Sequence, residues 1–90
     1  MTSYTIWLTE GCVINGHRLE KLAETNDSTQ IDKIWSDFVR EVLKVKIYYS
    51  RTLLDEENLT FWIDFGSYSK FIEISCADKE SYNRYLQKGD

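Results

Sequence analysis

The chain has 90 residues, a net charge of −4 and an aromatic content of 14%. This length supports one hydrophobic core, and the aromatic content excludes a disordered chain, because disordered segments are poor in such residues. Divided after Val45, the first half carries five Lys and Arg against seven Asp and Glu, and the second half six against eight, so both halves are acidic. Since no basic cluster is present, we expect no direct binding to nucleic acid and none to an anionic membrane surface.

The first regular pattern lies in Tyr4–Leu8, where apolar side chains alternate and Trp7 points to the opposite side. A two-residue period of β-forming residues predicts a strand. A second extended run, Cys12–Ile14, ends at Asn15-Gly16, a pair typical of a tight turn. From His17 the spacing becomes helical and predicts a short helix. Its apolar positions are Leu19, Leu22 and Ala23.

A long amphipathic helix is predicted over residues 28–45. Candidate N-cap residues lie in Asn26–Thr29, directly before the pattern begins. The apolar positions then step by three and one, which places them on one stripe of a helix. They are Ile31, Ile34, Trp35, Phe38, Val39, Val42 and Leu43.

Three runs rich in β-forming residues follow, at Ile47–Leu54, Leu59–Phe65 and Phe71–Cys76, and short polar loops separate them. Ser75 and Asp78 have the spacing of a capping box, which predicts a last helix over residues 78–87. The resulting order is β-β-(α)-α-β-β-β-α. It predicts a single two-layer α+β domain over residues 1–90, with a mainly antiparallel sheet packed on the long helix.

The last strands allow a prediction of register. With Phe65 opposite Lys70, the apolar residues share one face, Phe61 meeting Ile74 and Ile63 meeting Ile72. The reverse face then carries Thr60, Trp62, Asp64, Phe71, Glu73 and Ser75. With Leu54 opposite Leu59, the preceding strand adds Tyr49, Arg51 and Leu53 to it. Two readings stay open: a helix covers this reverse face and its aromatics are core residues, or the face is an exposed surface.

The residues needed for common catalytic or metal sites are scarce. His17 is the single histidine, and Cys12 and Cys76 form no CxxC pair, so neither a zinc set nor a nucleophile with its base is predicted. Both cysteines stand in apolar stretches and are expected to be buried free thiols, with a disulfide as the alternative. We therefore predict no catalytic residue, metal or cofactor. One alternative remains, a magnesium site formed by Asp64 and Glu73 on adjacent strands.

The stretch Cys12–Leu19, followed by Ile31–Trp35, resembles the opening of the barstar family of small acidic ribonuclease inhibitors. The resemblance covers a small minority of the chain. The three consecutive strands downstream depart from barstar's alternation of helices and strands, so no family is assigned from it.

The function predicted by elimination is that of a non-enzymatic protein-binding module. We expect a small acidic inhibitor or immunity-type protein that masks a basic partner such as a nuclease or toxin, because aromatic anchors dominate interfaces and opposite charge speeds association. The alternatives are a homo-oligomeric structural subunit and a metal-dependent enzyme that uses Asp64 and Glu73. The chain shows no signal peptide and no apolar run of membrane-spanning length, so we expect a cytoplasmic location. The predicted partner-binding residues are Tyr49, Asp55, Glu56, Glu57, Trp62, Asp64, Phe71 and Glu73.

Overall fold

The structure is a computed structural model that describes residues 2–11 and 16–87. Three predictions concern residues outside these ranges. They are the extended run Cys12–Ile14, the turn residue Asn15 and the free thiol of Cys12. Within the described ranges, no helix is both long and apolar enough to span a bilayer.

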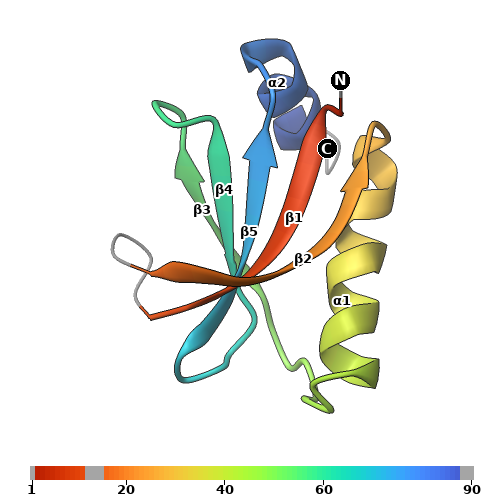
Figure 1. The fold of residues 1–90 in the computed structure, drawn as a ribbon, viewed down its shortest axis with the longest axis vertical. Helices are drawn as coiled ribbons and strands as arrows, with labels where there is room; N and C mark the ends of the chain where they lie inside the picture. Colours follow the sequence, from red (N-terminus) through yellow and green to blue (C-terminus); the bar gives the residue numbers. More distant parts are fainter. Residues whose placement is uncertain (1, 12–15, 88–90) are drawn as a thin grey trace.

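Five strands form one antiparallel sheet in the order β2-β1-β5-β4-β3. They are β1 (Tyr4–Glu10), β2 (His17–Thr25), β3 (Arg51–Asp55), β4 (Thr60–Asp64) and β5 (Lys70–Cys76). The strand β1 pairs with both β2 and β5, and β4 pairs with both β5 and β3. The two edges of the sheet are therefore β2 and β3 (Figure 1).

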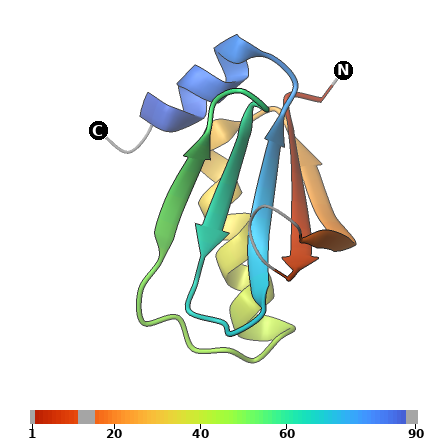
Figure 2. The same ribbon diagram turned by 90° about the vertical axis from the view of Figure 1, so that its left-hand side faces the viewer.

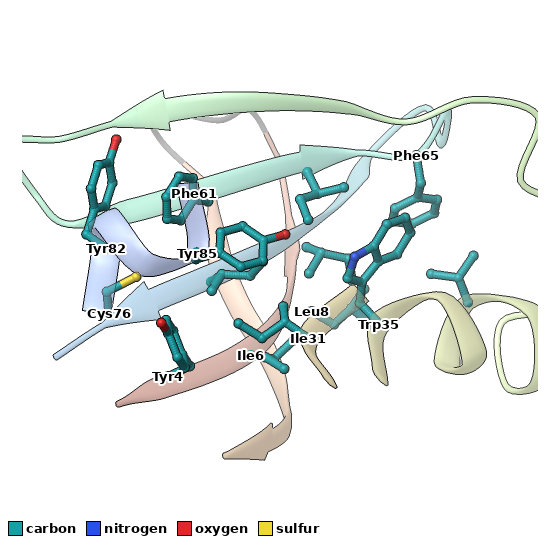
Figure 3. Packing of buried hydrophobic residues seen from close by; sticks show 14 residues of the cluster. Tyr4, Ile6, Leu8, Ile31, Trp35, Phe61, Phe65, Cys76, Tyr82 and Tyr85 are labelled. Carbon is teal, nitrogen blue, oxygen red and sulfur yellow. The ribbon is translucent and has the colours of Figure 1, made fainter. Parts of the chain in front are cut away.

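Two helices, α1 (Ile31–Glu41) and α2 (Lys79–Gln87), lie on the same side of the sheet. Figure 2 shows the sheet in front, with α1 running behind it and α2 crossing one end. The buried residues of both helices join those of one sheet face in a single core (Figure 3). Its aromatic center is Phe61, which stacks on Tyr82 at 4.4 Å between ring centroids and meets Tyr85 edge-on at 4.7 Å. The prediction of an α+β domain with a mainly antiparallel sheet is confirmed.

The predicted short helix after His17 is wrong, because these residues form β2. Two irregularities in its pairing with β1 explain the error. Ala23 and Lys21 lie opposite two consecutive residues of β1, so Leu22 between them has no partner. Leu19 is an extra residue in the same way, because Glu20 and Arg18 also lie opposite consecutive residues of β1. Each β-bulge resets the two-residue alternation. The apolar positions consequently fall three residues apart, which is the spacing of a helix.

The predicted long helix over residues 28–45 is also shorter in the structure. A 3₁₀ turn, η1 (Ser28–Gln30), comes first, and the Asp27 carboxylate caps it by accepting a 2.9 Å hydrogen bond from the Thr29 N–H. The α-helix proper then has 11 residues. It stops because Lys44 adopts φ +60°, in the left-handed region that reverses the chain after a helix.

The predicted register of β4 and β5 is confirmed, with Phe61 opposite Ile74 and Ile63 opposite Ile72. The predicted register of β3 is wrong by two residues, since Leu54 lies opposite Phe61. A shift of two leaves Arg51 and Leu53 on their predicted face, whereas the predicted strand from Ile47 begins only at Arg51 and Tyr49 precedes it. The cap of α2 differs as well: Ser75 belongs to β5, and the Asp78 carboxylate accepts a 2.8 Å bond from the Ser81 N–H.

Candidate functional site

The face of the sheet opposite the helices, called the outer face below, holds most of the predicted partner-binding residues. Alternation along each strand sends one set of side chains to the core and the next to this face. Figure 2 shows that neither α1 nor α2 lies in front of it, and its aromatic side chains Trp7, Trp62 and Phe71 are half-buried. Its members are Thr5, Trp7, Thr9, Arg18, Lys21, Glu24, Arg51, Leu53, Asp55, Thr60, Trp62, Asp64, Phe71, Glu73 and Ser75.

Glu73 occupies the middle of the outer face, between two indoles. Trp62 of β4 is its neighbor on one side and Trp7 of β1 its neighbor on the other. Although no helix covers it, Glu73 is only 5% exposed. A carboxylate this well buried is stable in its charged form only when it is paired and hydrogen-bonded.

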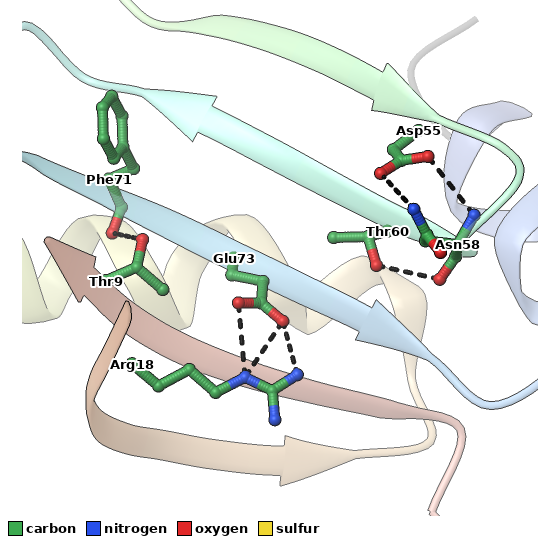
Figure 4. Close-up of polar contacts among 7 residues, drawn as sticks. All are labelled: Thr9, Arg18, Asp55, Asn58, Thr60, Phe71 and Glu73. Carbon is green, nitrogen blue, oxygen red and sulfur yellow. Dashed lines mark hydrogen bonds and ion pairs between the residues drawn. The ribbon is translucent and has the colours of Figure 1, made fainter. Parts of the chain in front are cut away.

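Arg18 of the edge strand β2 supplies that partner. Its Nη2 donates to Glu73 Oε2 at 2.6 Å and its Nε lies 3.2 and 3.3 Å from the two carboxylate oxygens (Figure 4). These hydrogen bonds raise the pKa of the Arg18 guanidinium. The same group lies over the Trp7 ring, 4.4 Å from its centroid, in a cation–π contact. Arg18 thus joins β2 to the center of the sheet.

Asp64 and Phe71 lie one step further along the same face. Asp64 pairs with Arg51 of β3 across 3.5 Å, and its Oδ1 accepts a 2.9 Å bond from the Gly66 N–H. Phe71 faces Thr9 of β1, whose hydroxyl donates to the Phe71 carbonyl at 3.2 Å (Figure 4). Glu73 and Asp64 are therefore each neutralised by an arginine.

Asp64 and Glu73 are diagonal neighbors on β4 and β5 and do not face each other. Glu73 faces Trp62, two residues along β4 from Asp64, and each carboxylate has its own arginine. Residues 2–11 and 16–87 contain no cluster of three or more His, Cys, Asp or Glu side chains suited to a metal ion. The structure consequently does not gather the acidic pair of the metal-enzyme alternative into a ligand set.

The other predicted binding residues lie at the two ends of β3. Tyr49 precedes the strand, and its ring contacts Gly66, where a Cβ atom would lie 3.5 Å from the Tyr49 Cε1. The turn after β3 holds the acidic segment of residues 55–57. There Asp55 accepts two bonds from Asn58, at 3.3 Å from its N–H and 2.9 Å from its Nδ2 (Figure 4). Glu56 pairs with Lys79 of α2. Glu57 is exposed.

Two central members of this face, Trp7 and Arg18, were not predicted from the sequence. Trp7 was placed on the opposite side of its strand from the apolar residues but was not joined to Trp62 and Phe71, because the pairing of β1 with β5 spans most of the chain. Arg18 was missed because its segment was predicted to be a helix.

A second candidate region is a cavity of about 380 Å³ on the helix side, between α1, α2 and β3. One wall carries Asp32, whose Oδ1 accepts hydrogen bonds from the Tyr85 hydroxyl at 2.7 Å and the Trp35 Nε1 at 3.0 Å. Burial, together with the bond to Asp32, raises the pKa of Tyr85. Another wall consists of Ser50, which precedes β3, and of Thr52 and Leu54 within β3.

Comparison of the chain with protein-family models, with curated proteins and with solved structures found no match. The proposals below therefore rest on the residues and their geometry.

Proposed function

We propose that the chain is a cytoplasmic, non-enzymatic protein-binding module whose outer face receives its partner. The observation that supports this most directly is a helix-free sheet face that carries Trp7, Trp62 and Phe71 on three adjacent strands. Aromatic side chains are enriched among the residues that dominate interface energies, and a sheet supplies them on a rigid support. No helix has to move for a partner to reach them.

The polar groups of this face are arranged to suit an interface. Glu73 and Asp64 are each paired with an arginine, so a partner that covers them meets compensated charges rather than isolated ones. Unpaired charge at the center of an interface would cost several kcal/mol on desolvation, about 3–5 for a broken buried pair.

We further propose that the partner is basic, as for an inhibitor or immunity-type protein that masks a nuclease or toxin. The attraction comes from the net charge of −4 and from the acidic turn of residues 55–57, not from the neutralised center. Charge of this kind raises the association rate and weakens with added salt.

The test uses affinity capture from extracts of the source cells, with the chain itself as bait. The double variant Trp62→Ala/Phe71→Ala removes two anchors, and we expect it to retain the partner at least about tenfold less well, since a hot-spot truncation costs more than about 1 kcal/mol. The matched control is Tyr68→Ala, which removes an aromatic ring that is fully exposed in the β4–β5 loop. The control should capture the same basic protein as the wild type, and capture should weaken as salt is raised.

Two results would contradict the proposal. One is equal retention of the captured protein by the wild type and the double variant. The other is saturable quenching of tryptophan fluorescence by a single-stranded oligonucleotide, because bases stack on exposed aromatic side chains when a sheet binds nucleic acid.

A further inference from the structure

The two edges of the sheet differ in how they are protected. The edge β2 is irregular, with bulges at Leu19 and Leu22, and it carries charged side chains along its length. Bulges and charges are the features with which natural proteins prevent an edge from pairing with another strand. The edge β3 pairs with β4 in an unbroken register and has no bulge, proline or lysine. Its outer side presents backbone N–H and C=O groups to solvent.

The sequence of β3, Arg-Thr-Leu-Leu-Asp, is complementary to itself in the antiparallel direction. When two copies pair about Leu53, Arg51 of each faces Asp55 of the other, and Leu53 faces Leu53. Arg51, Leu53 and Asp55 all belong to the outer face, so both ion pairs form on the same side. A parallel arrangement in the same register would instead oppose like charges, which destabilises cross-strand pairs.

The charged ends of β3 are available for such contacts. The Arg51 side chain is 67% exposed, and its pair with Asp64 is long, at 3.5 Å. Asp55 accepts bonds from Asn58, but a carboxylate has about four acceptor sites. Both groups can therefore keep their present contacts and accept a second partner.

Apolar residues on the helix side of β3 also favor pairing with a second copy of the chain. Leu54 is 58% exposed and lines the 380 Å³ cavity together with Leu86 of α2, which is also exposed. Antiparallel pairing about Leu53 places Thr52 of a second copy beside Leu54. The added strand extends the sheet beneath both cavities and covers apolar surface that an isolated chain leaves in water.

We propose that β3 pairs antiparallel with β3 of a second copy of this chain, forming a two-fold dimer with one continuous sheet. The pairing runs along the backbone edge of β3, where the side chains of Arg51 and Asp55 also border the outer face. The dimer leaves both outer faces open, so that it presents two partner-binding surfaces side by side.

The test is a charge exchange read by analytical ultracentrifugation over a range of concentrations. Arg51→Asp opposes two acids, and Asp55→Arg opposes two arginines. Since the two-fold axis repeats each change, we expect each variant to weaken association roughly 30-fold. The double variant Arg51→Asp/Asp55→Arg restores both pairs in reversed order, and its association should return to within about threefold of the wild type.

The matched control is Glu57→Arg, a charge reversal in the adjacent turn that lies outside the paired segment; it should leave the dimer unchanged. Hydrogen exchange on the wild type supplies a second measurement, in which the amides of residues 51–55 gain protection as concentration rises. A wild type that stays monomeric at every concentration overturns the proposal. So does a dimer that the single variants do not weaken, or one that the double variant does not restore.

The outcome is separable from that of the proposed function. The variant Trp62→Ala/Phe71→Ala should still dimerise through β3, and a wild type that stays monomeric but captures a basic partner would overturn the dimer alone.

Discussion

Replacing Arg18 with alanine removes the cation that holds the Glu73 carboxylate within the outer face. Glu73 stays where the sheet places it, between Trp62 and Trp7, but with no arginine bonded to either oxygen. The contact of the guanidinium with the Trp7 ring is lost at the same time.

The magnitude follows from the burial of the two partners. Removing one member of a fully buried ion pair costs about 3–5 kcal/mol, whereas an exposed pair is worth about 0–1 kcal/mol. Glu73 is 5% exposed, while the Arg18 side chain is 48% exposed, so this pair falls between these limits, at about 2 kcal/mol. The cation–π contact adds about 0.5–1 kcal/mol. We therefore expect Arg18→Ala to lower the free energy of unfolding by about 2.5–3 kcal/mol.

Urea unfolding followed by tryptophan fluorescence measures this loss. With a denaturant slope of about 1–2 kcal/mol/M for a chain of this size, the midpoint should fall by roughly 1–3 M. The double variant Arg18→Ala/Glu73→Gln should be more stable than Arg18→Ala alone, because the second change removes the uncompensated charge. Arg40→Ala is the matched control, since its 3.3 Å pair with Asp37 lies on the exposed side of α1, and it should stay within about 0.5 kcal/mol of the wild type.

The reasoning is refuted if Arg18→Ala unfolds within about 0.5 kcal/mol of the wild type. It is also refuted if the double variant is less stable than the single one, because Glu73 would then be stabilised by groups other than the arginine.

Three further outcomes are expected. Phe61→Ala should cost about 3–5 kcal/mol in urea unfolding, because Phe61 is fully buried against Tyr82 and Tyr85; a loss below about 1 kcal/mol would contradict this account of the core. Lys44→Gly should raise the free energy of unfolding by about 1 kcal/mol, since glycine adopts φ +60° without strain; unchanged or lower stability would contradict this account of the helix end. Burial raises the pKa of the Cys76 thiol from 9.0 to about 12, an effect to which Asp78 adds. The thiol is protonated in both folded and unfolded chains below pH 9, so its contribution is fully present there and is lost as pH rises from 9 towards 12. Cys76→Ala should flatten that decline in a pH series of urea midpoints, and an equal slope in both proteins would contradict it.

Much of the fold could be predicted because several elements carry a strong periodic pattern. The alternation in residues 59–65 predicted the face of every side chain of β4 and its register with β5, both of which the structure confirms. The pattern predicted the position of α1 but not its end, because the apolar spacing continues through Val42 and Leu43 after the backbone has left the helix.

The candidate site was predicted in part. Trp62, Asp64, Phe71 and Glu73 do share one face, as alternation requires. The burial of Glu73 and its arginine were not predicted, since Arg18 and Glu73 are 55 residues apart and lie on strands that are not neighbors. The sequence indicated an acidic side chain on the surface at Glu73, whereas in the structure Glu73 is buried and paired with Arg18.

The sequence by itself determined the faces of β1, β4 and β5 and the α+β class, because side-chain periodicity is a property of neighboring residues. Only the tertiary structure decided that residues 17–25 pair as a bulged edge strand and that α1 and α2 both cover the same face. These depend on which segments meet across long separations, where packing against a partner strand overrides local preference.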